Sequence, residues 1–348
     1  LSPSLDANLN RITISLIMLL GAALRLWRLG ELGLSYDEAA TALMARATPS
    51  EIIVFHWTAG FEHPPLWQLL AHAWSLVAGQ NEFALRSLPA LAGILVIPLV
   101  WQFARHLYPQ SSSIWHGSAL LAAMAPVLIY YSQDARMYAI VLALALGAMI
   151  VSTRLVRRPT WTGVLLLALL NVTMTGFHYY AALLFAAQGI YFLIAATTQP
   201  SFRSQWAKWL TALALSALPL LLWMAFSPGF QMTLGSVLSN TDAGGTPLFF
   251  FLDELWRDVT VAAIRWTPDW AWIGYLWLPL LGIGLLDALW LRRSSNWSKL
   301  SGWYLLSLLF VPVLFSALAF GQLSTRYVLY VAPALFILLA MGIVRLWN

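Results

Sequence analysis

The chain has 348 residues and a formal net charge of +5, yet 60% of its residues are hydrophobic and only 9% are charged. Because soluble domains carry about 25% charged residues, this composition excludes soluble enzymes, nucleic-acid-binding domains and disordered regulators. Cysteine is absent, which also excludes disulfides and thiolate catalysis. The composition therefore predicts an all-α polytopic protein that is integral to a membrane.

Ten apolar segments approach the roughly 20 residues that a membrane-spanning helix needs. In chain order they are residues 12–29, 86–107, 114–131, 137–153, 161–177, 179–197, 207–227, 270–291, 300–320 and 327–347. The first could be mistaken for a signal peptide, but no small-residue cleavage site follows it, so we expect an uncleaved anchor. We expect one integral membrane domain over residues 1–348 and no separate soluble domain.

Two long polar connections separate some of these spans. Residues 30–85 form the first, and their segment 65–78 is apolar but short, so it is interpreted as a helix lying in the membrane interface. Counting that segment as a span would invert every later connection. Residues 228–268 form the second connection, and residues 249–266 within it read as an amphipathic surface helix.

Basic residues set the expected orientation. With the N-terminus in the cytoplasm, the cytoplasmic connections hold Arg105, Arg154, Arg157, Arg158, Arg203, Lys208, Arg292, Arg293 and Lys299. The positive-inside rule favours this topology, which also places the C-terminus inside. Most acidic residues then fall on the opposite side, in the outer loops 30–85 and 228–268. This distribution favours an active site on the outer face. The expected location is a bacterial plasma membrane.

Ser35-Tyr36-Asp37-Glu38-Ala39 is the first candidate motif in the outer loops. Ser35 and Glu38 have the spacing of a capping box, so Glu38 could simply begin a helix. That explanation does not account for Asp37, which could accept a proton from a hydroxyl group as a general base. Both acids are therefore candidates.

Two further motifs combine charge with tyrosine. The segment from Tyr130 to Tyr138 contains Asp134 and Arg136, which exceeds what a plain polar hairpin between two spans needs. Arg326 at the start of the last span could bind phosphate through its planar fork of donors, or it could reach lipid headgroups. His63 could simply begin a rigid His-Pro-Pro loop, or its side chain could position a phosphate.

Several motifs in a fixed order carry a resemblance to a known family. They are the motif at 35–39, His63-Pro64-Pro65-Leu66, Arg86 to Gly93, Tyr131 to Tyr138, His178-Tyr179-Tyr180 and Arg326-Tyr327. In this order they resemble the GT-C membrane glycosyltransferases. Within that superfamily, the chain is similar to the protein-mannosyltransferase and aminoarabinose-transferase-like branch, often called glycosyltransferase family 39.

The resemblance implies a polyprenyl-phosphate-linked sugar donor, and an acceptor hydroxyl on a protein, lipid or glycan. It implies that Asp37, Glu38 and Asp134 are catalytic. It also implies that the substrates are bound by His63, Arg86, Tyr131, Arg136, Tyr138, His178, Tyr179, Arg326 and Tyr327. No cofactor is expected to be required, although the outer acids could gather a divalent metal ion, as in related oligosaccharyltransferases.

The expected reaction is an inverting hexosyl or pentosyl transfer with Asp37 as general base. Two other functions stay open at this point. The chain could be a catalytically silent accessory subunit of a larger membrane complex, or a flippase for lipid-linked sugars. A flippase needs a polar path through the bilayer, and the spans offer little beyond Asp287.

Overall fold

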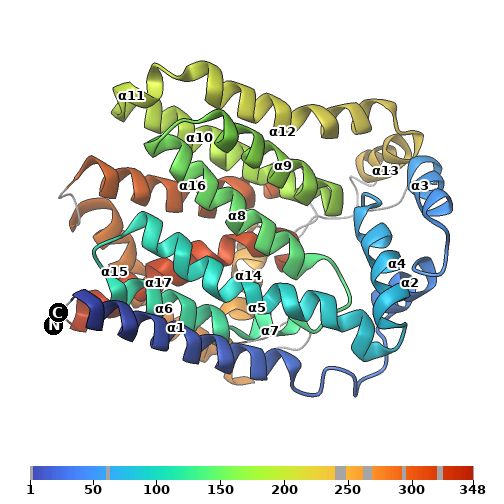
Figure 1. Ribbon diagram of the computed structural model, residues 1–348, viewed down its shortest axis with the longest axis horizontal. Helices are drawn as coiled ribbons and strands as arrows, with labels where there is room; N and C mark the ends of the chain where they lie inside the picture. The colour runs from blue at the N-terminus through green and yellow to red at the C-terminus, as the bar shows by residue number, and fades with distance from the viewer. Residues whose placement is uncertain are drawn as a thin grey trace.

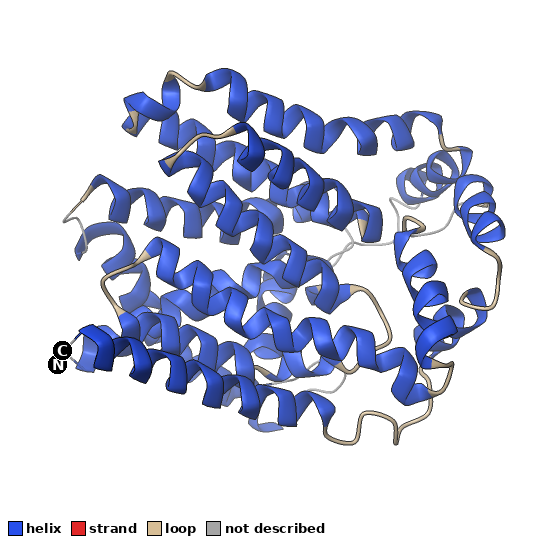
Figure 2. Cartoon of the chain, in the orientation of Figure 1, coloured by secondary structure: helices blue, strands red, loops and turns tan. Residues whose placement is uncertain are grey.

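The computed structural model describes residues 3–59, 63–239, 248–261, 269–291, 295–319 and 324–347. These residues form helices and their connections, and they contain no strand (Figure 2). The long helices lie side by side in a bundle, and both chain termini are at one of its ends (Figure 1). The predicted all-α fold is therefore confirmed.

Each of the ten predicted ranges contains helix. The main helices in these ranges are α1 (Pro3–Leu26), α5 (Glu82–Leu107), α6 (Ser112–Met124), α7 (Pro126–Ser132), α8 (Tyr138–Arg157), α9 (Trp161–Phe177), α10 (Leu183–Thr198), α12 (Trp206–Phe226), α15 (Leu278–Leu286), α16 (Asn296–Ala319) and α17 (Ala332–Trp347). Short elements flank some of them: the 3₁₀ helices η1 (Tyr179–Ala182), η2 (Asp269–Trp277) and η4 (Thr325–Val331), the π-helix η3 (Asp287–Leu291) and α11 (Pro200–Arg203).

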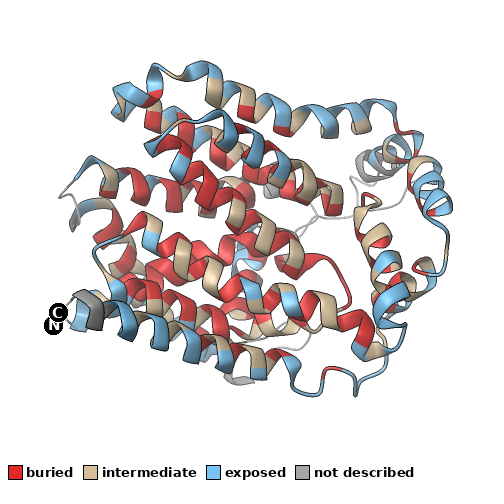
Figure 3. Cartoon of the chain, viewed as in Figure 1, coloured by how far each residue is buried: buried red, intermediate tan, exposed pale blue. Residues whose placement is uncertain are grey.

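In the described residues, eight helical segments are long and apolar enough to cross a membrane. The bent pair α6 and α7 would be a ninth, and the 17-residue α9 is a shorter apolar helix. The chain is thus a multi-pass membrane protein, and the predicted count of ten is approximate. Segments α8 and η4–α17 are the most buried, whereas α1 and α12 expose most of their surface at the edges of the bundle (Figure 3).

The bend between α6 and α7 has a local cause. Pro126 cannot donate a main-chain hydrogen bond and disfavours helical backbone in the preceding Ala125, so the two helices meet at 56°. The buried Arg25 guanidinium donates to the carbonyl oxygens of Ala122 at 3.0 Å and Ala123 at 2.9 Å. These bonds satisfy carbonyls that the end of α6 leaves without helical partners.

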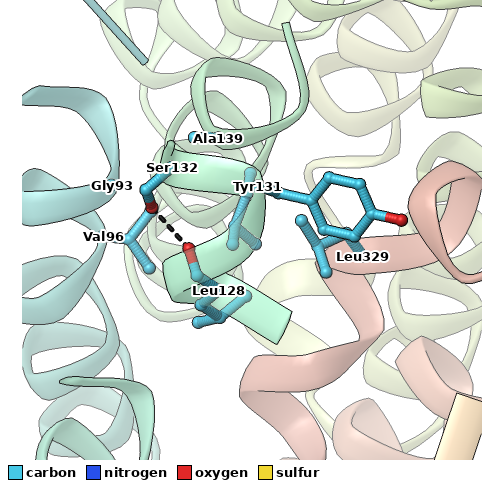
Figure 4. Close-up of a pocket in the computed structure, with 8 residues that line it drawn as sticks. Gly93, Val96, Leu128, Tyr131, Ser132, Ala139 and Leu329 are labelled. Carbon is cyan, nitrogen blue, oxygen red and sulfur yellow. Dashed lines mark hydrogen bonds between the residues drawn. The ribbon is translucent and has the colours of Figure 1, made fainter. Parts of the chain in front are cut away.

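A close contact between α5 and α7 fixes where the second half of the bend lies. A Cβ atom on Gly93 would lie 1.9 Å from Ser132 Oγ, so only glycine allows this approach. Figure 4 shows Ser132 facing Gly93, while the neighbouring Tyr131 points toward Leu329 of η4. Tyr131 and Ser132 are therefore held in fixed and opposite directions.

Three short helices cross one end of the bundle instead of joining it. They are α2 (Tyr36–Met44), α3 (Pro49–Thr58) and α4 (Leu66–Ala78), and they lie together at the end opposite the termini (Figure 1). The 13 residues of α4 extend only about 20 Å, less than the roughly 30 Å of a bilayer core. Helix α4 is therefore too short to span a membrane, and its position in the membrane interface stays a prediction.

The second polar connection contains α13 (Pro228–Ser239) and α14 (Leu248–Val261). Residues 262–266 of the predicted amphipathic helix lie outside the described residues. Helix α14 packs against α7 and η4, and its buried face includes Phe251, Leu255 and Asp258. This helix is therefore more deeply packed than the predicted surface helix.

Candidate functional site

Glu38 begins α2 through the predicted capping box. Its carboxylate accepts from the Ser35 main-chain nitrogen at 2.8 Å, and the Ser35 hydroxyl accepts from the Glu38 nitrogen. Arg86 adds two bonds to this carboxylate, at 2.7 and 2.9 Å, and the Ala135 nitrogen adds one at 2.9 Å. Burial acts to raise the pKa of Glu38, but these hydrogen bonds outweigh it and hold the pKa below its ordinary value.

The Arg86 guanidinium binds one carboxylate and three main-chain carbonyl oxygens. Besides binding Glu38, it donates to the carbonyl oxygens of Leu29, Leu32 and Gly33 at 3.2, 2.7 and 3.0 Å. The pair thereby joins α5, α2 and the connection that follows α1. Arg86, predicted to bind substrate, is placed in a buried structural ion pair.

Asp37 faces a different environment from its neighbour. Its side chain is 42% exposed, and its Oδ2 lies 3.2 Å from Nη1 of Arg326. This contact joins residues 289 positions apart in the chain. Arg136 donates to the Asp37 carbonyl oxygen at 3.5 Å, so two guanidinium groups converge on this residue.

His178 lies between α9 and η1 and lines a narrow cavity beside Arg326. The cavity is also lined by Tyr138, Val141, Leu142, Tyr327, Leu329 and Tyr330. Burial, followed by the nearby Arg136 and Arg326, lowers the pKa of His178 to about 3, so the ring is neutral. Its Nδ1 accepts from the Tyr180 main-chain nitrogen at 3.2 Å, which places the proton on Nε2.

This tautomer makes His178 a buried hydrogen-bond donor. Within the described residues, neither His178 Nε2 nor Arg326 Nε has a hydrogen-bond partner. The Tyr138 hydroxyl lies beside the Arg136 guanidinium without the geometry of a regular hydrogen bond. Buried polar groups are normally satisfied, so this convergence of donors suits an anionic ligand.

Aromatic rings surround the cavity. The His63 ring lies 4.7 Å from that of His178, and burial together with His178 and the two arginines lowers the pKa of His63 well below its ordinary value. Tyr327 lies 5.2 Å from His178 and stacks on Tyr180 at 4.7 Å. Tyr131 contributes through its ring, which lies 5.2 Å from that of Tyr138.

The remaining predicted residues lie apart from the cavity lining. Asp134 is half-buried in the turn after α7, and its charge acts on Arg86. Tyr179 points the other way, because its hydroxyl accepts from Trp223 Nε1 at 2.9 Å and its ring packs against Phe230.

The structure thus brings together Asp37, His63, Tyr131, Arg136, Tyr138, His178, Arg326 and Tyr327. The Asp134 carbonyl accepts from the Arg136 nitrogen at 2.6 Å, which fixes the turn that carries Arg136 toward this group. We call the eight residues Asp37, His63, Tyr131, Arg136, Tyr138, His178, Arg326 and Tyr327 the Arg326 cluster. Glu38 and Arg86 border the cluster as a structural pair, and Tyr179 lies outside it.

Sequence reasoning missed several residues beside the Arg326 cluster. Tyr330 donates its hydroxyl to the Tyr180 carbonyl oxygen at 3.0 Å. On α14, Glu254 lies close enough to Arg326 for their charges to interact. Asp258 is buried next to Thr325, and this burial raises its pKa to about 6.

The sequence did contain a signal for Asp258. The buried positions 251, 255, 258 and 259 follow the spacing of one helix face. An acid on the apolar face of a predicted amphipathic helix is a candidate for a buried polar role. In the described part of the chain, no three His, Asp or Glu side chains come together in the way a metal site requires.

The helical bundle and its end-on short helices define a multi-pass membrane protein. Residues 62–223 match the sequence model of the dolichyl-phosphate-mannose-protein mannosyltransferase family. This range includes His63, Arg136 and His178 but neither Asp37 nor Arg326. A comparison with curated protein sequences found no significant match.

Solved structures with this fold include ArnT from Cupriavidus metallidurans bound to undecaprenyl phosphate. That structure has a TM-score of 0.64 at 14% identity, over 99% of this chain and 61% of ArnT. Apo ArnT gives a TM-score of 0.61 at 16% identity, over 95% and 59%. An Archaeoglobus fulgidus oligosaccharyltransferase in complex with Zn and sulfate gives 0.62 at 14% identity, over 95% and 49%.

The chain therefore spans about six tenths of ArnT and half of the oligosaccharyltransferase. At these identities the solved structures establish the fold. Together with the family match, they confirm the predicted resemblance to GT-C proteins of the mannosyltransferase and ArnT type.

Proposed function

We propose that the chain is a glycosyltransferase that moves a hexosyl or pentosyl group from a polyprenyl-phosphate donor to an acceptor hydroxyl. The acceptor is a protein, a lipid or a glycan at the outer face of a bacterial plasma membrane. The observation that carries this proposal is the half-exposed ion pair between Asp37 and Arg326 beside a cavity with buried donors. It sets a group suited to accept a proton next to a group suited to bind phosphate.

In this proposal the donor phosphate binds Arg326 and Arg136. The Nε2–H of His178 and the Tyr138 hydroxyl add neutral donors from the cavity wall. Phosphate oxygens accept several charge-assisted hydrogen bonds at once, which suits this mixed set. The similar fold of ArnT, whose structure was solved with undecaprenyl phosphate, supports a lipid phosphate as the ligand.

Binding of the phosphate would also prepare the base. Without ligand, Arg326 interacts with the Asp37 carboxylate at 3.2 Å. A phosphate that takes over Arg326 frees this carboxylate to face the acceptor. The same guanidinium therefore links donor binding to the readiness of the base.

The reaction then proceeds in one displacement. The acceptor oxygen forms a bond to the anomeric carbon and gives its proton to Asp37. The bond between that carbon and the phosphate oxygen breaks, and its electron pair stays on the phosphate, which gains one negative charge. Arg326 and Arg136 stabilise this charge. Attack from the face opposite the phosphate inverts the anomeric carbon.

Glu38 and Asp134 have supporting roles in this arrangement. Glu38 accepts from the Ala135 nitrogen, so it fixes the turn that carries Arg136. Asp134 lies in the same turn and adds negative charge near Arg86. Glu38 is thus assigned a positioning role, and Asp37 is the proposed base.

The substitution Asp37→Asn tests the proposal in a transfer assay with a synthetic polyprenyl-phosphate sugar. Loss of the base is expected to lower the rate by about 10²–10⁴, and the product should have the inverted anomeric configuration by NMR. Glu31→Gln is the matched control, because Glu31 forms an exposed ion pair with Arg28 away from the cluster.

Unchanged transfer by Asp37→Asn would contradict the assigned base. A wild-type protein that transfers no sugar from any polyprenyl phosphate would instead favour an accessory subunit of a membrane complex.

A further inference from the structure

Four basic side chains gather at the C-terminal end of α5, at the opposite end of the bundle from the Arg326 cluster. They are Arg105 and His106 on α5, and Arg154 and Arg157 on α8. We call this group the Arg105 cluster. Arg86 and Arg105 are nineteen positions apart on α5, which separates them by about 28 Å along the helix axis. This end of the bundle also holds both chain termini (Figure 1).

The arginines of the Arg105 cluster are held in place by neutral groups. Arg154 directs Nε and Nη2 at His106 Nε2, each at 3.3 Å, and this nitrogen accepts, so the imidazole is neutral. Arg157 donates to the His106 carbonyl oxygen at 2.8 Å and lies 3.8 Å over the ring of Trp297.

Arg105 completes the cluster on the α6 side. Its guanidinium lies 5.2 Å from the centre of the Trp101 ring and 5.5 Å from that of Trp115. Arg105 and Arg154 are exposed, so each can present further N–H donors to a ligand outside the chain.

Charge compensation differs sharply between the two ends. In the described residues, ion pairs join Arg28 to Glu31, Arg86 to Glu38, Arg257 to Asp253 and Arg326 to Asp37. Within the same residues, no carboxylate forms an ion pair with Arg105, Arg154 or Arg157. A helix C-terminus carries roughly −0.5 elementary charge, so the ends of α5 and α8 together offset about one of the three positive charges.

We propose that the Arg105 cluster binds the phosphate of an anionic phospholipid. Arginine matches phosphate through its planar fork of donors, and basic groups between spanning helices at a membrane face favour anionic headgroups. Trp101, Trp115 and Trp297 point to a membrane lipid as the source of the phosphate, because tryptophan prefers the boundary between headgroups and hydrocarbon. The site is independent of the proposed glycosyl transfer.

Native mass spectrometry of the purified protein tests this site. The protein is released from nanodiscs that contain equal amounts of phosphatidylglycerol and phosphatidylcholine. Wild type is expected to retain phosphatidylglycerol preferentially. In the double variant Arg105→Gln, Arg154→Gln, the ratio of retained phosphatidylglycerol to phosphatidylcholine should fall about 10-fold, since each basic residue contributes to headgroup binding. Arg28→Gln, which removes an exposed and already paired charge, should leave it unchanged.

A second measurement does not depend on the variants. Phosphatidylglycerol should raise the Tm of the wild-type protein more than phosphatidylcholine does, and 10 mM inorganic phosphate should not replace this effect. Equal retention of the two lipids by wild type, equal retention by the double variant and wild type, or full replacement by inorganic phosphate would each overturn the proposal.

Discussion

Asp37 and Glu38 are adjacent in the chain, yet their surroundings separate their roles. Glu38 is buried and accepts from Arg86, Ser35 and Ala135, so its oxygens are fully occupied. Asp37 is half-exposed and its carboxylate pairs with Arg326. Of the two acids, Asp37 is therefore the one that the proposed acceptor hydroxyl can reach.

This contrast predicts that Glu38→Gln harms stability more than Asp37→Asn does. Glutamine keeps the capping geometry but leaves Arg86 as a buried charge without its partner, which typically costs about 3–5 kcal/mol. Thermal unfolding in detergent measures the effect. Glu51→Gln is the control, because Glu51 forms the same capping box in α3 while exposed and without an arginine. Similar losses of stability in Glu38→Gln and Glu51→Gln would contradict the structural role of the buried Glu38–Arg86 pair.

Only part of the surroundings of these two acids could be predicted from the sequence. The spacing of Ser35 and Glu38 is local, so the capping box could be predicted from it. The partners that distinguish the two acids lie 48 positions away at Arg86 and 289 positions away at Arg326. Only the folded chain brings them together, and the order of family motifs can suggest these contacts but cannot assign them to one acid or the other.

Among the elements, α14 links the second polar connection, residues 228–268, to the Arg326 cluster. Asp258 on its buried face lies beside the Thr325 hydroxyl of η4, directly before Arg326. Burial raises the pKa of Asp258 to about 6, opposed in part by Thr325 and Arg257. Ionised Asp258 therefore destabilises the folded state.

Asp258→Asn should accordingly stabilise the protein in a pH-dependent way. A carboxyl whose folded pKa is raised costs stability above that pKa, and the cost disappears as pH falls toward the unfolded value near 4. The gain should reach roughly 2–3 kcal/mol above pH 6 and vanish near pH 4. Unfolding curves of variant and wild type across this range measure it, and a difference independent of pH would contradict the raised pKa.

The contact between α5 and α7 predicts a second effect at this scale. Gly93→Ala would place a methyl group against Ser132, so overpacking should cost about 1–3 kcal/mol. Adding Ser132→Gly should recover part of this loss. Gly282→Ala in α15 is the control, because its new methyl group meets nothing within 4 Å. An equal response at both glycines in thermal unfolding would contradict the close packing.

Hydropathy located the spans because it is a property of about 20 consecutive residues. It placed one helix over 114–131, where the structure has α6 and α7 meeting at a bend. Pro126 marks this break in the sequence, but the contacts that hold the two halves in place come from other helices, through Arg25 on α1 and Gly93 on α5. The 3₁₀ helix η4 was likewise not predicted, since its form depends on packing against α8 and α14.

At the scale of the whole molecule, the two charged clusters lie at opposite ends of a bundle that is long enough to cross a bilayer. Acids pair with arginines at the end that carries the Arg326 cluster, and uncompensated arginines gather at the other. The positive-inside rule favours the cytoplasm for the Arg105 cluster. The Arg326 cluster would then face the outside, where the proposed donor and acceptor meet.

The absence of native cysteine allows this topology to be tested directly. Leu32→Cys lies in the exposed connection after α1, and Gln110→Cys lies in the exposed turn between α5 and α6. In intact cells, a membrane-impermeant maleimide should label Leu32→Cys within minutes and leave Gln110→Cys unlabelled until the membrane is permeabilised. The opposite labelling pattern would place the Arg326 cluster in the cytoplasm, and the acceptor would then have to be a cytoplasmic hydroxyl. Helix α5, with 26 residues, lies between the two labelled ends of the bundle. If α5 spans the membrane, Leu32 and Gln110 must be on opposite sides, so labelling of both from one side would contradict a spanning α5.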